Sequence, residues 1–198
     1  MKVMSRLVTV TLVVTLLVLA GCTNDAGTRS DAEPKGSGPD DAPTGMVVVE
    51  TDLGSVARPQ AWKPAPSESV AQEASFLITD DAGETVGQMD VILNTVTPGT
   101  RADAVAAAAD SARLANLPTL RHTTREFTDV PGAASAFVTE STYRTSDTGE
   151  PALSLDQVAV TEAGDYMLVR ITAAKAHYDA EFFTSVVDTM KLSKGAGS

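Results

Sequence analysis

The pattern of apolar and polar residues predicts a β-hairpin in the first half of the chain. Met89, Val91 and Leu93 alternate with the polar residues Gln88, Asp90 and Asn94, which is typical of a strand with one buried and one wet face. This strand, over 85–96, is expected to pair with a strand over 74–79. The turn between them, Asp-Asp-Ala-Gly-Glu at 80–84, consists of residues that tolerate a tight backbone.

A break at Pro98 and Gly99 is followed by a predicted helix over 100–116. Thr100 and Asp103 place a hydroxyl and a carboxylate three residues apart, as in a capping box. The stripe that we expect to be buried consists of small side chains, namely Ala102, Val105, Ala109 and Ala112. Such a face lets a helix lie close to a sheet.

A second helix is predicted near the C-terminus, with Asp179 as its N-cap and Tyr178 packing back onto Phe183. Its apolar residues recur at helical spacing and form one stripe, made of Phe182, Phe183, Val186, Val187 and Met190. This stripe is expected to be part of the core.

The remaining structured segments have the composition of β-strands. A β-branched run at 46–49 is the first of them, and the prolines within 58–64 are expected to keep that segment out of regular structure. Four strands joined by short turns are predicted between the two helices, over 120–128, 134–145, 153–161 and 166–173. Short turns favour antiparallel neighbours.

This order of strands and helices predicts an α+β domain in which helices pack on a twisted antiparallel sheet. The segments Pro-Gln-Ala-Trp at 59–62 and Phe-Phe-Thr-Ser-Val-Val-Asp-Thr-Met-Lys-Leu at 182–192 resemble the two ends of the PsbP-like fold, an α/β/α sandwich. That fold is seen in small actinobacterial lipoproteins of the LpqN type. The resemblance covers about 46–192 and implies an accessory or binding role without enzymatic activity. It supplies no catalytic residues.

Residues 1–21 have the parts of an export signal, with Lys2 and Arg6 ahead of an apolar run that is too short to span a bilayer. The Leu-Ala-Gly-Cys sequence at 19–22 resembles the lipobox of bacterial lipoproteins, in which a diacylglycerol is attached to the cysteine sulfur. Cys22, the only cysteine, is therefore the expected lipidation site, and two acyl chains (palmitate) would anchor it stably. The alternatives are an ordinary secretory signal with a chance cysteine and an uncleaved single-span anchor.

Composition divides the rest of the chain into three parts. Residues 22–45 contain mainly Gly, Ser, Pro, Asp and Thr, which predicts a lipidated cysteine followed by a flexible acidic tether. A single domain is expected over 46–192, and 193–198 is expected to be a loose tail.

The charge of the chain limits its partners. The formal net charge is −11, and removal of the signal, which holds two basic and no acidic residues, would make it −13. This surface repels nucleic acid and anionic lipid headgroups. Contact with the membrane is therefore expected only through lipid on Cys22, at the extracytoplasmic face of the cell membrane. An envelope protein or glycolipid is the expected partner.

The sequence offers few candidates for a chemical site. His122 and His177 have no His or Cys at metal-ligand spacing, and we interpret them as surface or turn residues. The acidic segment 80–84 is better explained by a hairpin turn than by calcium binding. The chain shows no nucleophile elbow and no glycine-rich nucleotide loop. No catalytic residue, cofactor or metal site is therefore predicted.

Two features could serve recognition. Several polar residues lie within predicted strands and are interpreted as a solvated sheet face, with a recognition surface as the alternative: Asp90, Asn94, Arg121, Arg125, Glu140, Arg144 and Arg170. The single tryptophan, Trp62, is expected to fill the edge of the core, and the alternative is an exposed anchor that contacts a partner.

Together these features predict a lipid-anchored envelope lipoprotein with a non-catalytic binding or accessory role. A carrier of a small apolar or lipid-like ligand is the alternative, with a pocket that the alanine-lined helix would leave above the sheet. An enzyme without a recognisable motif ranks third.

Overall fold

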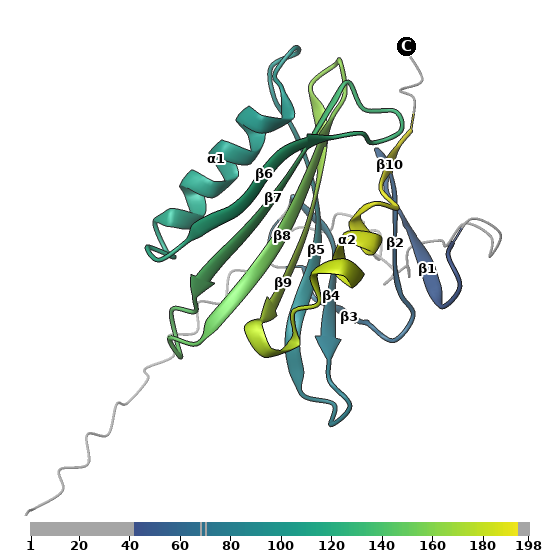
Figure 1. The fold of residues 1–198 in the computed structure, drawn as a ribbon. Coiled ribbons are helices and arrows are strands. Elements are labelled where there is room, and N and C mark those ends of the chain that lie inside the picture. Colours follow the sequence, from purple (N-terminus) through teal and green to yellow (C-terminus); the bar gives the residue numbers. More distant parts are fainter. Residues whose placement is uncertain (1–41, 68, 70, 194–198) are drawn as a thin grey trace, which may run out of the picture. The chain divides into compact units, whose positions relative to one another are not determined.

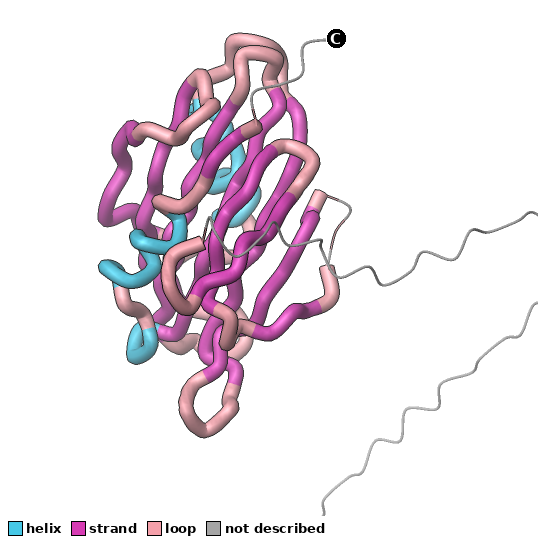
Figure 2. Tube along the Cα trace, turned by 90° about the vertical axis from the view of Figure 1, so that its right-hand side faces the viewer, coloured by secondary structure: helices cyan, strands magenta, loops and turns pink. Residues whose placement is uncertain are grey.

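The computed structural model describes residues 42–67, 69 and 71–193. Within these residues the elements follow one another as β1 (Met46–Glu50), β2 (Gly54–Pro59), β3 (Lys63–Ala65), β4 (Gln72–Thr79), β5 (Thr85–Thr95), α1 (Ala102–Leu114), β6 (Arg121–Thr128), β7 (Ser135–Arg144), β8 (Pro151–Val160), β9 (Asp165–Ala174), the 3-10 helix η1 (Lys175–His177), α2 (Ala180–Val187) and β10 (Lys191–Leu192). About half of this part of the chain is strand (Figure 2).

Seven strands form one antiparallel sheet in the order β3-β4-β5-β9-β8-β7-β6. The predicted hairpin of β4 and β5 is confirmed, as are the four strands β6 to β9 between the helices. The two groups of strands join where β5 pairs with β9, and this register sets Asp90 opposite Arg170. Residues on adjacent strands and the same face of the sheet are thereby brought together although they are far apart in the sequence.

The two faces of this sheet are covered differently (Figure 1). One face carries α1, which packs mainly on β7 and β8. The other face carries α2 together with a second, three-stranded sheet in the order β1-β2-β10. In this small sheet β10 returns to β2 so closely that a Cβ at Gly54 would lie 2.1 Å from the Lys191 carbonyl oxygen. The predicted α+β class, with antiparallel sheets and helices packed on them, is confirmed.

The larger core lies between the seven-stranded sheet and α2. Phe183, Val186, Val187 and Met190 are at most 2% exposed, so four of the five residues of the predicted stripe are buried. Phe182 is 39% exposed and lies at its margin. Asp179 caps α2 as predicted, because its Oδ1 accepts a hydrogen bond from the Phe182 N–H at 3.0 Å.

A smaller core lies between α1 and the sheet. Ala102, Val105 and Ala106 pack on apolar side chains of β7, β8 and β9, as small residues on a close-packed helix should. The prediction was wrong at Ala112, which is exposed, while Asp110 is buried two residues earlier. The predicted capping box was also wrong, because the first N–H of the helix, that of Ala102, donates to Ser135 Oγ on β7 at 2.8 Å.

The segment 58–64 is more regular than its prolines suggested. Pro59 ends β2, and Pro64 lies in the three-residue strand β3, opposite Phe76. Because β3 is the edge strand of its sheet, a residue without an N–H is tolerated there. Among the described residues, no helix is long and apolar enough to cross a bilayer.

Candidate functional site

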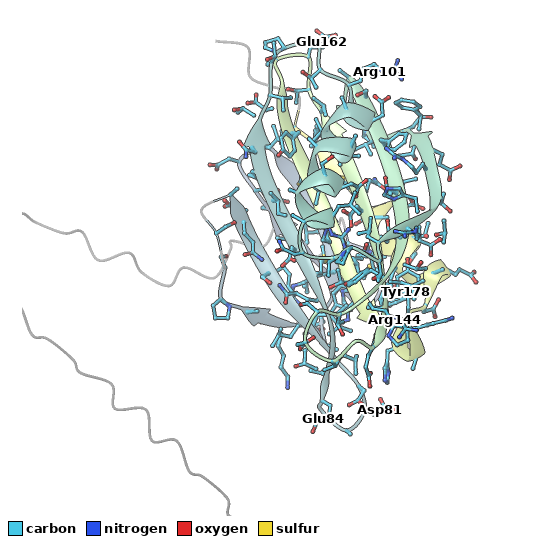
Figure 3. All side chains as sticks on the ribbon, turned by 90° about the vertical axis from the view of Figure 1, so that its left-hand side faces the viewer. Asp81, Glu84, Arg101, Arg144, Glu162 and Tyr178 are labelled. Carbon is cyan, nitrogen blue, oxygen red and sulfur yellow. The ribbon has the colours of Figure 1, made fainter. Side chains whose placement is uncertain are left out.

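Polar and charged side chains gather on the α1 side of the seven-stranded sheet, beside the small core. Alternation along a strand directs every second residue of β4, β5, β8 and β9 to this face, and α1 adds one arginine from its last turn. We define the polar cluster as Gln72, Ser75, Gln88, Asp90, Arg113, Ser154, Asp156 and Arg170. Figure 3 shows α1 and this face of the sheet from the front.

The centre of the polar cluster is a buried ion pair. Asp156 is 4% exposed, and Arg170 donates to both of its carboxylate oxygens, with Nε 2.9 Å from Oδ2. Arg113 Nη1 lies 3.6 Å from the same Oδ2 and donates to Ser154 Oγ at 3.1 Å. Although burial opposes it, the Asp156 carboxylate raises the pKa of Arg170 above its ordinary value. Asp156 therefore fixes two cations at once.

The outer part of the polar cluster is organised by Asp90. Its Oδ1 accepts hydrogen bonds from Gln72 Nε2 at 2.6 Å, Ser75 Oγ at 2.8 Å and Gln88 Nε2 at 2.7 Å. Neighbouring side chains thus supply the donors that this carboxylate needs. Side-chain hydrogen bonds of the polar cluster therefore link β4 to β5, β8 to β9, and the end of α1 to β8.

A second group of polar residues, adjacent to this one, joins α1 to the edge of the sheet. His122 Nδ1 lies 3.0 Å from Ser141 Oγ, and His122 Nε2 lies 3.4 Å from Asp110 Oδ2. A serine, a histidine and an aspartate in contact suggest nucleophilic catalysis. Ser141, however, is only 1% exposed, so a substrate cannot reach its hydroxyl. The interpretation of His122 as a simple surface residue was wrong, because it bridges α1 and β7.

The pH dependence of stability should reveal the burial of Asp110. Burial raises the pKa of this carboxyl above 3.8, although His122, Arg113 and Arg125 oppose the shift and Asp156 adds to it. As pH rises above the ordinary value, the unfolded state loses its proton first, so this residue's contribution to stability falls. We expect Asp110→Asn to gain stability relative to the parent as pH rises above about 4.

Urea denaturation of both proteins across this range measures the difference in unfolding free energy. The same comparison in a His122→Gln background removes the imidazole, so that a difference that remains belongs to Asp110. If the difference in unfolding free energy between Asp110→Asn and the parent does not change with pH, or becomes less favourable to the Asn variant as pH rises, the raised pKa of Asp110 is contradicted.

An open groove lies on the opposite face of the sheet, between α2 and the strands β6, β7 and β8. Its volume is about 230 Å³. Val138, Leu155 and Gln157 line it from β7 and β8, and α2 borders it from Ala180 to Asp188. We call it the α2 groove. Unlike in the polar cluster, several of its polar side chains are exposed, among them Glu126, Thr184 and Asp188.

The candidate site residues named from the sequence do not come together in one site. Cys22 lies outside the described residues. Trp62 is 6% exposed and makes edge contacts with Phe182 and Phe183, at ring-centroid distances of 6.3 and 6.1 Å. It therefore fills the core, which was the first of its two interpretations. His177 is exposed at the end of η1.

The acidic turn at 80–84 is a hairpin turn, as predicted. Asp80 Oδ1 accepts hydrogen bonds from the Ala82 and Glu84 N–H groups, both at 2.9 Å. Within the part of the chain that the structure describes, no three His, Cys, Asp or Glu side chains come together as a metal site.

The prediction of a solvated sheet face holds only in part. Asn94, Arg121, Arg125 and Arg144 are exposed, whereas Arg170 and Asp90 belong to the polar cluster and Glu140 lies on the α2 side. Sequence reasoning did not identify Asp156, Asp110 or Arg113. A signal did exist for Asp156, since it is a single charge within the otherwise uncharged strand β8.

Comparison with known proteins gives a likeness of fold. No family model matches the chain, and no curated protein matches it. The crystal structure of LpqN, described as involved in cell envelope biogenesis of Mycobacterium tuberculosis, is similar with a TM-score of 0.51 and 18% identity, covering 75% of this chain and 90% of LpqN. At this identity the likeness shows a fold related to that of LpqN.

Two further structures are more distant. A protein from Bacteroides thetaiotaomicron has a TM-score of 0.48 and 12% identity, covering 72% of this chain and 46% of its own. A protein of unknown function from Pseudomonas aeruginosa has a TM-score of 0.40 and 11% identity, covering 73% and 94%. Neither carries an argument here.

Proposed function

We propose that this protein is a lipid-anchored lipoprotein with a PsbP-like domain, held at the extracytoplasmic face of the cell membrane, and that it acts there by binding and not by catalysis. The anchor is Cys22, in the Leu-Ala-Gly-Cys sequence at 19–22. The related fold of LpqN, a protein described as involved in cell envelope biogenesis, supports a role in the envelope. The partner is an envelope protein or glycolipid.

One observation carries the non-catalytic role. The groups that could do chemistry are already occupied by one another beneath α1, and the one serine that contacts a histidine is closed to solvent. A catalytic site needs an open position where substrate can meet the reacting group. The accessible α2 groove holds no such pair of nucleophile and base.

The structure gives less support to a carrier of an apolar ligand. That function required a pocket left above the sheet by the alanine-lined helix. Ala102 and Ala106 instead pack in one cluster with Val158 and Leu168 of the sheet. The α2 groove is lined by both polar and apolar side chains, as expected for recognition of a polar partner.

The anchor can be tested by replacing Cys22 with serine, which removes the thiol but keeps the side chain small. In a lipoprotein-processing bacterium, Cys22→Ser is expected to lose all incorporation of radiolabelled palmitate and to leave the detergent phase on Triton X-114 partitioning. The reason is that the acyl chains supply the membrane affinity of a protein whose surface is acidic. A Thr23→Ser variant, which keeps the cysteine, should label like the parent. Normal labelling of Cys22→Ser would refute the anchor.

A further inference from the structure

The α2 groove is rich in hydrogen-bond acceptors. Three carboxylates line it, those of Glu126 on β6, Glu140 on β7 and Asp188 at the end of α2. Its lining also contains threonine hydroxyls but no lysine, arginine or histidine. A ligand that fits this chemistry must supply donors, and a cation matches three carboxylates best.

The Gln157 side chain adds a neutral acceptor to the carboxylates of the groove. Gln157 is 2% exposed, and its Nε2 donates to the Val187 carbonyl oxygen at 3.2 Å, which fixes the orientation of the amide. The free acceptor is then Oε1, and the side chain lines the α2 groove. Within the described part of the chain, no donor reaches Oε1. An amide oxygen that is presented to an open groove can accept a hydrogen bond from a donor on a partner.

The position of Asp188 suggests that the negative charge has a purpose other than stability. It follows Val187 as the C-cap of α2, where the helix dipole already places partial negative charge. Lysine or arginine is favoured at such a position, and the last turn of α2 has neither. Asp188 therefore adds unfavourable charge to a groove that already contains two other carboxylates. A bound cation would relieve this repulsion.

We propose that the α2 groove binds a lysine or arginine side chain presented by a basic segment of a partner protein. The groove, at about 230 Å³, is smaller than the roughly 300–1,000 Å³ of pockets that enclose whole small molecules. It has room for one long side chain, whose methylenes would lie on Val138 and Leu155 and whose charged end would face the carboxylates. The charge of −11 on the whole chain attracts such a segment from a distance. This proposal rests on the binding role proposed above.

The test is an NMR titration of the purified, isotope-labelled full chain with a hexa-arginine peptide at physiological salt. Saturable shift changes are expected at the amides of Thr124, Thr184 and Asp188, and a neutral hexa-glutamine peptide should cause none. Asp188→Asn and Glu126→Gln should each weaken binding at least about tenfold, because a charged hydrogen-bonded pair loses one partner. Without peptide, Asp188→Asn should melt at a higher temperature than the parent, which shows that the variant is folded.

Matched controls separate the groove from the general acidity of the surface. Asp81→Asn and Glu162→Gln make the same change of charge in two loops at opposite ends of the sheet (Figure 3) and should leave the affinity nearly unchanged. If these variants weaken binding as much as Asp188→Asn, or if the shifts do not centre on the groove, the proposal is overturned. Palmitate labelling of Cys22 tests the lipid anchor separately. The groove proposal can therefore fail while the anchor proposal stands, and the reverse.

Discussion

Replacing Phe183 with alanine is expected to lower the free energy of unfolding by about 3–5 kcal/mol. The ring is 2% exposed and is packed against Trp62 and Tyr178, at centroid distances of 6.1 and 5.1 Å. Truncation removes the buried ring and leaves a cavity where α2 meets the sheet. The expected loss is a large part of the 5–15 kcal/mol that stabilises a typical domain.

The neighbouring Phe182 provides a matched control. It has the same side chain on the same helix but is 39% exposed. Phe182→Ala is expected to cost no more than about 1 kcal/mol, because its ring is partly exposed and contacts Trp62 and Phe183 only at the margin of the core. Urea denaturation of the purified proteins measures both values. A cost below about 1 kcal/mol for Phe183→Ala would show that α2 is attached to the surface and is not part of the core.

The helices and the long strands could be predicted because periodicity is a local property. Alternation from Met89 to Leu93 located β5, and the spacing of Phe183, Val186 and Met190 located the buried side of α2. These patterns exist because each element buries one side on the same sheet. The sequence alone was sufficient for that part of the fold.

The small sheet could not be predicted in the same way. β10 is two residues long, and β2 contains a glycine and a proline, so neither has a period that can be measured. Their pairing is a tertiary contact between Ser55 and Lys191, more than a hundred residues apart. Such short strands exist because they pair, and their own composition does not reveal them.

The polar cluster was missed for a related reason. A charge in a strand is usually solvated, so Asp90 and Arg170 were assigned to a wet face, and Asp110 was not considered for the buried side of α1. Asp110 is buried, and Asp90 and Arg170 are half-buried, because α1 lies over the sheet and because the register of β5, β8 and β9 sets opposite charges side by side. That register depends on long-range pairing, which one sequence does not show.

Asp156→Asn is expected to cost about 3–5 kcal/mol of unfolding free energy. The substitution keeps the size of the side chain and creates no cavity, so it isolates the charge. Arg170 and Arg113, with side chains 17% and 11% exposed, would then face a neutral amide that cannot accept the bidentate contact. A buried cation without its counter-charge keeps its desolvation penalty and loses the attraction that offset it.

Two comparisons show whether burial causes this cost. Asp103 pairs with Arg101 at 3.3 Å on the exposed side of α1, and Asp103→Asn should cost at most about 1 kcal/mol because solvent screens such pairs. The double variant Asp156→Leu/Arg170→Met replaces the central pair with apolar side chains and should be more stable than Asp156→Asn alone, since no arginine is left opposite an amide. Chemical denaturation of the four proteins gives the ranking. Equal losses for Asp156→Asn and Asp103→Asn would mean that water reaches the polar cluster, and that its carboxylates are open to a ligand after all.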